Sequence, residues 1–357
     1  MRAKTFRIGK LMGLLTAAML AVCAFGLPQA AVALAASADY GTCQVLYLPV
    51  ALNPGGPAAQ TVVANYCTPT VWAGDSHAID ILTPGASYNR MYWDWPQDPN
   101  LYSYVDKTLH AGRATLTYDR VGSGQSSHPL SVAISYDGEA YVLHQLVQWA
   151  QTTAGYSKVT TIGHSYGSMI SINEARTYHD INRLVLTGLL HSIVTPGLTS
   201  VMGKAYPAAL DPEFFGQTLD LGYITTEPGS RAADFYDTST ADPSVIAYDE
   251  AHKDMVTSTG LGEAIATVAV PAPLNISQGV TAPVLIVVGQ RDALFCNAQP
   301  LTPDCTSNTS VQNFEAPYFV AAPSVSAVTV PNTGHDLALH PSAEQSFAAI
   351  NAWIESH

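Results

Sequence analysis

Short apolar runs alternate along the chain with longer stretches in which apolar residues recur every three or four positions. The short runs are rich in β-branched residues and predict buried strands at 77–83, 113–119, 158–164, 183–190, 283–290 and 324–331. The longer stretches predict helices at 138–151, 166–177 and 342–356. Strands that alternate with helices predict an α/β fold, with a mostly parallel central sheet and helices on both faces.

Two further β-rich runs precede the first of these strands and flank the turn sequence NPGGP at residues 53–57. This pattern predicts an antiparallel hairpin at one edge of the sheet. Cys43 and Cys67 lie symmetrically about Gly55. We therefore expect the two cysteines to face each other across the hairpin and to form a disulfide.

The first 35 residues have a different pattern. A basic start is followed by an apolar and small-residue run at 11–27 and by the motif Ala33-Leu34-Ala35. This order predicts a secretory signal peptide at 1–35, cleaved after Ala35, and therefore a secreted, extracellular protein. An uncleaved membrane anchor is the alternative, but the apolar run is at or below the length needed to cross a bilayer. No later run is long and apolar enough, so we expect no stable membrane insertion.

Secretion bears directly on the cysteines. Removal of Cys23 with the signal peptide leaves four cysteines in an oxidising compartment, where disulfides are stable. With Cys43 paired to Cys67, Cys296 and Cys305 close a short loop that contains two prolines. Free thiols or a C-x8-C metal site are the alternative, but no suitably spaced histidine accompanies these cysteines.

The charge balance excludes several kinds of partner. The whole chain has 15 basic and 28 acidic residues, and cleavage after Ala35 removes four basic residues, which moves the net charge from −13 to −17. Such a surface repels nucleic acids and anionic membranes and favours solubility outside the cell. No basic cluster is present, so we expect no nucleic-acid partner.

Cleavage leaves 322 residues, which is more than a single core usually holds. Residues 192–280 lie between two predicted sheet strands, are rich in Pro, Gly, Thr and aromatic residues, and carry few strand signals. A structureless loop of that length is implausible in a compact domain. We therefore expect a core built from 36–191 and 281–357, with residues 192–280 inserted as a cap over one end of the sheet.

The strand at 158–164 runs directly into Ser165, and the next helix begins at once. Gly163 and Gly167 flank the serine, where a sharp strand-to-helix turn leaves no room for larger side chains. The helix N-terminus also offers free N–H groups and a positive dipole, which suit a developing oxyanion. By its letters alone, G-x-S-x-G is equally typical of an ordinary turn. Its place between strand and helix favours a nucleophile.

A serine hydroxyl needs a general base, and the base needs an acid that orients it. Asp292 and His335 each follow a predicted strand, and residues after the carboxyl ends of parallel strands meet at one edge of a sheet. Taken singly, a loop aspartate and a loop histidine are well explained as structural. Together with Ser165, in the order Ser, Asp, His, they predict a catalytic triad.

On these residues the chain resembles the α/β-hydrolase superfamily, and in particular its secreted fungal and actinobacterial members with two disulfides and a cap. The resemblance implies that Ser165 is the nucleophile, Asp292 the acid and His335 the general base. It covers nearly all of the mature chain outside the cap.

The resemblance also implies an oxyanion hole made of two backbone N–H groups. One belongs to Tyr166, the residue after the nucleophile, and the other to the loop TPGASYN, where Ala86 is the best match and Ser87 the alternative. The family often has His-Gly in this loop, whereas this sequence has Pro84-Gly85. That departure bears on which N–H completes the hole, because the hole needs amides rather than the histidine.

Aromatic residues follow the oxyanion loop in the stretch YNRMYWDWP. Tyr88, Trp93 and Trp95 are predicted to line an apolar acyl pocket, or alternatively to be core between sheet and helix. Asp336 and His340 lie beside His335, but no second cluster completes a metal site. We expect no metal and no cofactor.

These residues together predict a secreted serine hydrolase that cleaves carboxylic esters through an acyl-enzyme. Its expected substrates are small-molecule or lipid-like esters, of the esterase or lipase type, with lactones included. Peptidase or amidase activity and cofactor-free perhydrolysis use the same triad and are the alternatives. A non-catalytic binding protein on this scaffold is a further alternative, although such proteins typically lose a triad member and all three are present.

Overall fold

The structure is a computed structural model that describes residues 40–74, 77–192, 196–296 and 302–357. The predicted signal peptide, residues 1–35, lies outside the described residues. No helix in the described part of the chain is long and apolar enough to cross a membrane.

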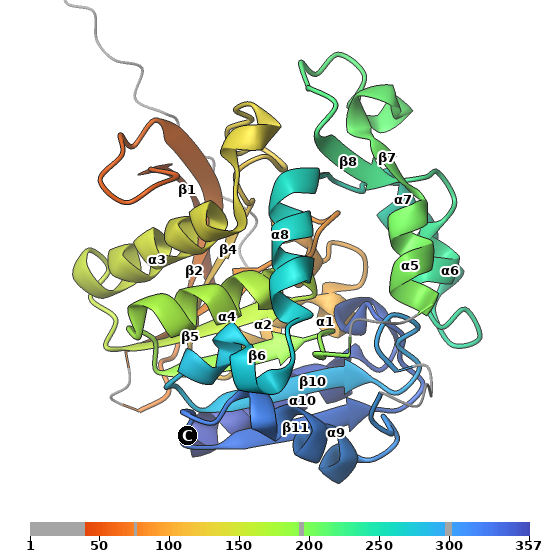
Figure 1. The fold of residues 1–357 in the computed structure, drawn as a ribbon. Helices are drawn as coiled ribbons and strands as arrows, with labels where there is room; N and C mark the ends of the chain where they lie inside the picture. Colours follow the sequence, from red (N-terminus) through yellow and green to blue (C-terminus); the bar gives the residue numbers. More distant parts are fainter. Residues whose placement is uncertain (1–39, 75–76, 193–195, 297–301) are drawn as a thin grey trace, which may run out of the picture. The chain divides into compact units, whose positions relative to one another are not determined.

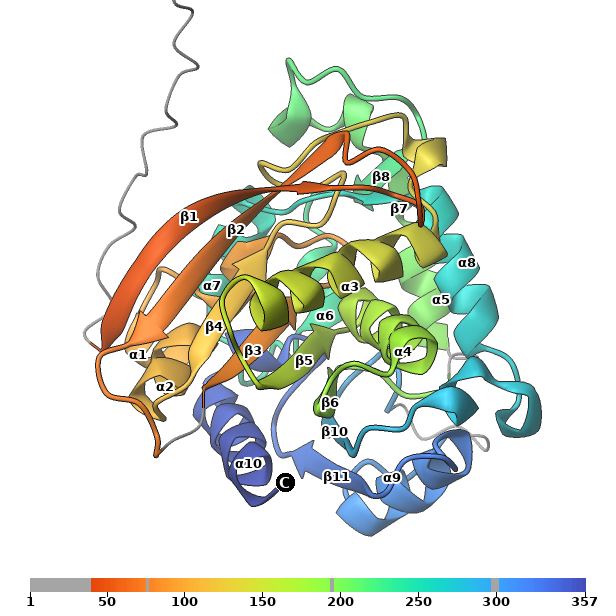
Figure 2. The same cartoon turned by 90° about the vertical axis from the view of Figure 1, so that its left-hand side faces the viewer.

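Eight strands form the central sheet, in the order β1-β2-β4-β3-β5-β6-β10-β11 (Figures 1 and 2). β1 pairs antiparallel with β2, and β2 pairs antiparallel with β4, whereas every other neighbouring pair is parallel. The predicted α/β-hydrolase fold, with an antiparallel N-terminal hairpin, is therefore confirmed. The strands are β1 Gly41–Val50, β2 Gln60–Pro69, β3 Ala78–Thr83, β4 Ala114–Tyr118, β5 Lys158–His164, β6 Arg183–Thr187, β10 Val284–Gly289 and β11 Val325–Val330.

The α-helices of the core lie on both sides of this sheet (Figure 2). α3 and α4 pack side by side over the central strands, while α2 and α10 pack against each other on the other face. α3 and α10 each bury an apolar stripe against the core, whereas α4 is buried on all sides over its first ten residues. The helices are α1 Pro99–Tyr102, α2 Tyr104–His110, α3 Tyr136–Thr152, α4 Tyr166–Tyr178, α9 Asn308–Glu315 and α10 Ala343–Ser356.

The segment between β6 and β10 has its own small sheet (Figure 1). Three short antiparallel strands, too short to leave a periodic pattern in the sequence, pair in the order β7-β8-β9. The elements of this segment are α5 Pro196–Gly203, β7 Ala205–Pro207, β8 Tyr223–Thr226, α6 Arg231–Phe235, α7 Pro243–Ala251, β9 Val256–Thr257 and α8 Ser258–Val268.

Single-turn 3-10 helices connect several elements. They are η1 Arg90–Trp93, η2 Ser131–Ala133, η3 Ala208–Leu210, η4 Pro212–Phe214, η5 Ala272–Leu274, η6 Ile276–Gly279, η7 Ala316–Tyr318 and η8 Leu337–Leu339.

Both predicted disulfides are present. Cys43 and Cys67 are directly opposed in the β1–β2 register and are bonded, as are Cys296 and Cys305. The alternative of free thiols or a cysteine metal site is therefore excluded.

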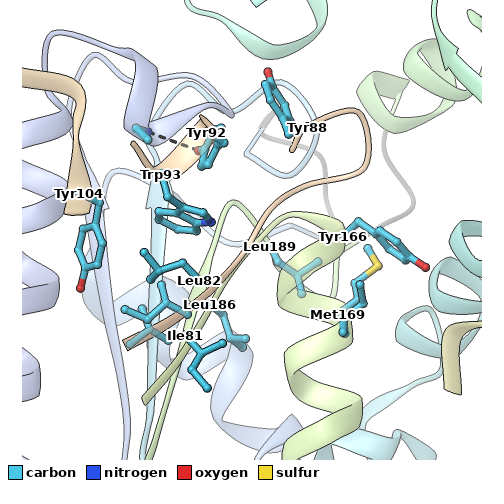
Figure 3. Close-up of a cluster of buried hydrophobic side chains, with 14 of the residues drawn as sticks. Ile81, Leu82, Tyr88, Tyr92, Trp93, Tyr104, Tyr166, Met169, Leu186 and Leu189 are labelled. Atoms are coloured by element: carbon cyan, nitrogen blue, oxygen red, sulfur yellow. Dashed lines mark hydrogen bonds between the residues drawn. The ribbon is translucent and has the colours of Figure 1, made fainter. Parts of the chain in front are cut away.

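Apolar side chains fill the space between the sheet and its helices (Figure 3). Ile81 and Leu82 of β3 lie beside Leu186 of β6, and Trp93 lies against this group. The edge of the sheet at which these strands end is thus backed by a solid core, which gives the loops there a rigid support.

Candidate active site

Ser165 occupies the turn between β5 and α4. Its backbone has φ 52° and ψ −116°, a region that non-glycine residues rarely adopt and that costs about 1–3 kcal/mol. A Cβ atom on Gly163 would collide with the backbone of Gly167, and one on Gly167 would collide with the carbonyl oxygen of Thr83. The two glycines therefore permit a turn tight enough to hold the Ser165 side chain at the end of the sheet.

His335 and Asp292 meet in the loops that follow β11 and β10. Nδ1 of His335 lies 2.9 Å from Oδ2 of Asp292, and both side chains are buried. The other carboxylate oxygen of Asp292 accepts backbone N–H groups from Leu294 at 2.8 Å and Phe295 at 3.2 Å. The two N–H groups thus fix the carboxylate of Asp292. Asp292 in turn holds Nδ1 of the imidazole, which leaves Nε2 available to accept a proton.

The pKa of His335 reflects these neighbours. Burial alone would lower the pKa of the imidazole, but the charge and hydrogen bond of Asp292, together with the nearby charge of Asp336, raise it above its ordinary value. The protonated form of His335 is therefore stabilised. A general base needs this stabilisation, because it must hold the proton that it accepts.

Ser165 and His335 line the same cavity. Among the described residues, the Ser165 hydroxyl and the His335 ring are not hydrogen-bonded to each other. His335 is therefore paired with Asp292, and Ser165 lines the same cavity as this pair's histidine. Apart from His335, the lining residues that the structure describes include no ionisable group other than two tyrosines. The lining comprises Ala86, Ser87, Tyr88, Tyr166, Met169, Leu198, Val201, Met202, Phe235, Leu261, Ile265, Leu294 and Phe295.

Two backbone amides beside Ser165 are available as donors. The N–H groups of Ala86 and Tyr166 make no backbone hydrogen bond within the described residues, and both residues line the cavity. Ser87 lines the same wall. The residues that carry the predicted oxyanion donors thus line the same cavity as Ser165, from the loop after β3 and the first turn of α4.

The sequence of residues 81–349 matches the model of the alpha/beta hydrolase family. The chain belongs to the alpha/beta hydrolase family. Its sequence matches none of the curated proteins with which it was compared.

Solved structures share the fold at low sequence identity. A carboxyl esterase from Bacillus coagulans, in complex with glycerol, is 17% identical with TM-score 0.60 and coverage of 88% of this chain and 98% of that one. A thermophilic esterase from Thermogutta terrifontis is 18% identical, with TM-score 0.54 and the same two coverages. A monoacylglycerol lipase from Paleococcus ferrophilus is 15% identical, with TM-score 0.51 and coverage of 83% and 99%.

In this hydrolase, Arg120 holds the loop that carries Ala86. Its Nη2 donates to the carbonyl oxygens of Gly85 at 3.0 Å and Ala86 at 2.9 Å, and its Nη1 pairs with Glu139 at 3.2 Å. Glu139 also accepts the hydroxyl of Tyr166 at 3.2 Å. One buried arginine therefore ties both predicted oxyanion residues to a single carboxylate.

A second buried arginine reaches the same loop from the segment between β6 and β10. Arg231 forms a bidentate pair with Asp249, with both bonds at 2.8 Å, and donates to Oγ of Ser87 at 2.7 Å. Its guanidinium also lies 4.3 Å from the centre of the Tyr88 ring. Sequence reasoning missed both arginines as supports of the site, because their partners are distant in the chain.

Asp336 connects this network to the histidines. It accepts the hydroxyl of Tyr88, which also lies 3.1 Å from Asp249, and its other oxygen is 3.2 Å from Nε2 of His164. His164 is fully buried, its ring is stacked on Tyr92, and its pKa is lowered by burial and by His335. His164 thus packs beneath the turn as a neutral support rather than as a reactive group.

The aromatic residues predicted to line the acyl pocket divide into two groups. Tyr88 lines the cavity, but Trp93 and Trp95 do not. Trp93 packs edge-on to Tyr104 and Trp95 packs edge-on to Tyr248, with each tryptophan 1% exposed. Both tryptophans belong to the hydrophobic core. Much of the pocket wall comes instead from α5, α6 and α8, together with Met169 of α4 and the loop after β10.

Proposed function

We propose that the protein is a secreted serine hydrolase that cleaves carboxylic esters through Ser165, His335 and Asp292. One observation carries the proposal: a serine in a rare backbone conformation at the end of a central strand shares an apolar cavity with a histidine that is paired to a buried aspartate. The esterases and the lipase of the same fold are in accord with this chemistry.

The reaction begins with Oγ of Ser165 attacking the carbonyl carbon of the ester while Nε2 of neutral His335 takes the hydroxyl proton. Asp292 keeps the imidazole in the required tautomer. The oxyanion accepts hydrogen bonds from the amides of Ala86, or its neighbour Ser87, and Tyr166, each worth about 3 kcal/mol in comparable sites.

His335 then gives its proton to the leaving alcohol, and the acyl group stays on Ser165. A water molecule attacks this acyl-enzyme with His335 again as base, so that the carboxylic acid leaves and Ser165 regains its proton. No step requires a group other than these residues and water.

The acyl group that fits best is apolar. Apart from Ser87, the side chains described in the cavity wall beyond the triad are apolar or aromatic, and Leu198, Val201, Leu261 and Ile265 come from α5 and α8. A charged acyl group would lose its hydration there without a paired partner. We infer that residues 192–280 act as a cap that selects uncharged esters, lactones included.

Secretion completes the proposal. It is supported by the leader pattern at 1–35, the net charge of −13 for the whole chain, and two disulfides, which are stable in oxidising compartments. Production with the native leader and sequencing of the N-terminus from the medium tests this point: the first residue should be Ala36, and retention of residues 1–35 would contradict it.

A fluorophosphonate probe tests the chemistry directly. The wild-type protein should be labelled on Ser165 and should hydrolyse p-nitrophenyl esters, and Ser165→Ala should lose both properties while remaining folded. A series of acyl lengths, lactones and amino-acid amides assayed in parallel then ranks substrates. Labelling that persists in Ser165→Ala would refute the assignment of the nucleophile, and a preference for amides would refute the ester assignment.

A further inference from the structure

A second polar cluster lies away from the active site, between α3 and the far end of α4. His144 comes from α3, Glu174 from α4 and Asp180 from the loop that follows α4. Nδ1 of His144 is 2.8 Å from Oδ2 of Asp180 and 3.9 Å from Oε1 of Glu174. One atom from each of the three side chains lies within 4.8 Å of both others.

Four polar atoms of this cluster lack a hydrogen-bond partner in the described part of the chain: both carboxylate oxygens of Glu174, Oδ1 of Asp180 and Nδ1 of His144. Glu174 is 0% exposed, and neither of its carboxylate oxygens has a hydrogen-bond partner in the described part of the chain. Oδ1 of Asp180 is likewise unpartnered, and the contact between His144 and Asp180 lies outside hydrogen-bond geometry. Buried polar atoms are normally satisfied, and an unsatisfied carboxylate is among the most costly exceptions.

When its two carboxylates are ionised, the cluster is not neutral. With both carboxylates ionised and His144 protonated, the cluster carries a net charge of −1. Arg176, the nearest arginine along α4, is directed to Asn173 and Asp137 instead. A divalent cation with a neutral imidazole brings the cluster to zero net charge and gives each carboxylate a positively charged partner.

We propose that His144, Glu174 and Asp180 bind a divalent transition-metal ion, with Zn²⁺ as the best fit. One imidazole and two carboxylates form a mixed nitrogen and oxygen set, which suits Zn²⁺ better than Mg²⁺ or Ca²⁺, since the latter prefer oxygen alone. The side chains of His144 and Asp180 are 19% and 16% exposed, so an ion can enter and water can complete the coordination.

The surroundings hold two of the ligands in position. Nε2 of Gln148 donates to Oδ2 of Asp180 at 3.0 Å, and the Tyr178 ring stacks on His144 with centroids 3.7 Å apart. Such partners orient ligands in metal sites. The ion would join α3 to α4 and to the loop beyond, which makes its role structural. This departs from the expectation of no metal, which considered only residues close together in the sequence.

A proton is the rival occupant. In the absence of an ion, burial raises the pKa of Glu174 to about 8, so a protonated Glu174 would also relieve the charge. Glu174→Gln separates the two cases, because it keeps the shape of the side chain and resembles the protonated acid but removes a metal ligand.

The experiment uses untagged mature protein, treated with EDTA, dialysed and then titrated with ZnCl₂ while the midpoint of thermal unfolding is followed. Wild type should gain about 3–6 °C at saturating Zn²⁺ and retain one zinc per chain by elemental analysis after dialysis. CaCl₂ and MgCl₂ should give no comparable shift. Glu174→Gln and Asp180→Asn should lose both the zinc-induced shift and the bound zinc.

His335→Ala is the matched control, because His164, His335 and Asp336 form another buried group of candidate ligands. This variant should keep the zinc-induced shift and the bound zinc. The proposal is overturned if wild type retains no zinc, if Ca²⁺ stabilises as well as Zn²⁺, or if the effect is lost in His335→Ala and kept in Glu174→Gln. If Glu174→Gln does not fold, the zinc-induced shift in Asp180→Asn and the number of zinc ions per wild-type chain still test the proposal.

Discussion

Among the residues that the structure describes, two serine–histidine–acid groups can be compared, and they differ in an instructive way. In the second group, Nδ1 of His191 is 2.6 Å from Oε2 of Glu315, and Nε2 of His191 is 2.9 Å from Oγ of Ser277. As a hydrogen-bonded chain it is more complete than the first, in which Ser165 is not bonded to His335 among the described residues. Ser277 is nevertheless 0% exposed, whereas Ser165 faces a cavity.

The difference shows which features make such a group reactive. Ser165 stands in a rare backbone conformation, beside two unengaged amides, at the start of a helix of 13 residues. Ser277 lies within the short 3-10 helix η6, and its backbone N–H is satisfied by the side chain of Asn275. We therefore interpret the first group as catalytic and the second as a tie between η6, the loop after β6 and the end of α9.

The largest expected difference between the two groups is in turnover. Ser165→Ala should lower kcat for p-nitrophenyl esters by on the order of 10⁴-fold or more, because the nucleophile is removed. Ser277→Ala should leave kcat within about twofold, since no substrate can reach Ser277. Steady-state kinetics of both purified variants make the test. Equal losses would abolish the distinction.

Substitution of the two acids, Asp292 and Glu315, should affect different properties: turnover for Asp292 and stability for Glu315. Asp292→Asn should lower kcat by roughly 10³–10⁴-fold, because the amide favours the wrong tautomer of His335. Glu315→Gln should lower the free energy of unfolding by about 2–3 kcal/mol and leave kcat nearly unchanged, because it unpairs a buried donor. Urea unfolding and kinetics on the same samples distinguish the outcomes. A loss of turnover in Glu315→Gln with unchanged stability would contradict this view.

The proposed oxyanion donors also distinguish the first group from the second. Arg120→Lys should lower kcat roughly tenfold with a smaller change in KM, because lysine cannot hold the carbonyls of Gly85 and Ala86 together while pairing with Glu139. Arg113→Lys is the matched control: Arg113 is equally buried but pairs with Asp80, on β3. Kinetics of the two variants should differ. A similar kcat in both would show that Arg120 only stabilises the fold.

The smallest effect concerns pH. Because the pKa of His335 is raised and the base must be neutral, kcat/KM should be lost as the pH falls through a value above about 6.5. Asp336→Asn removes a negative charge that raises this pKa, so the acid limb of the pH profile should move to lower pH. Glu315→Gln should leave the limb in place. A limb that moves upward in Asp336→Asn would refute the assigned influence of Asp336.

The parts of the fold that leave a local pattern could be predicted from the sequence. The β-branched runs at β3, β5, β10 and β11 mark buried strands, and alternation with helices implies a parallel sheet. Ser165, Asp292 and His335 could be singled out because each directly follows such a strand. The cysteine pairs followed from a hairpin and from short separation in the chain.

The remainder depends on contacts between distant residues. Arg231 and Ser87 are 144 residues apart in the sequence, and Glu315 and His191 are 124 residues apart. No local spacing in the sequence predicts either contact. The position of Trp93 and Trp95 after the oxyanion loop suggests pocket residues, but both side chains are buried in the core, because a position in the sequence does not determine the direction of a side chain. The strands β7 to β9 are too short for periodicity to reveal them.

The pairing of β6 with β10 also has a consequence for the order of folding. Leu184 pairs with Val284, so the two ends of the long segment between β6 and β10 must come together before these strands can pair. Closing so long a loop costs entropy before any contact compensates for it, and such non-local pairing is slow. Asp292 and His335 lie in the loops after β10 and β11, so we expect them to reach their final positions only after β10 has paired with β6. During refolding we expect the hairpin and the β3–β5 region to form first, with hydrolytic activity recovered in the slowest phase.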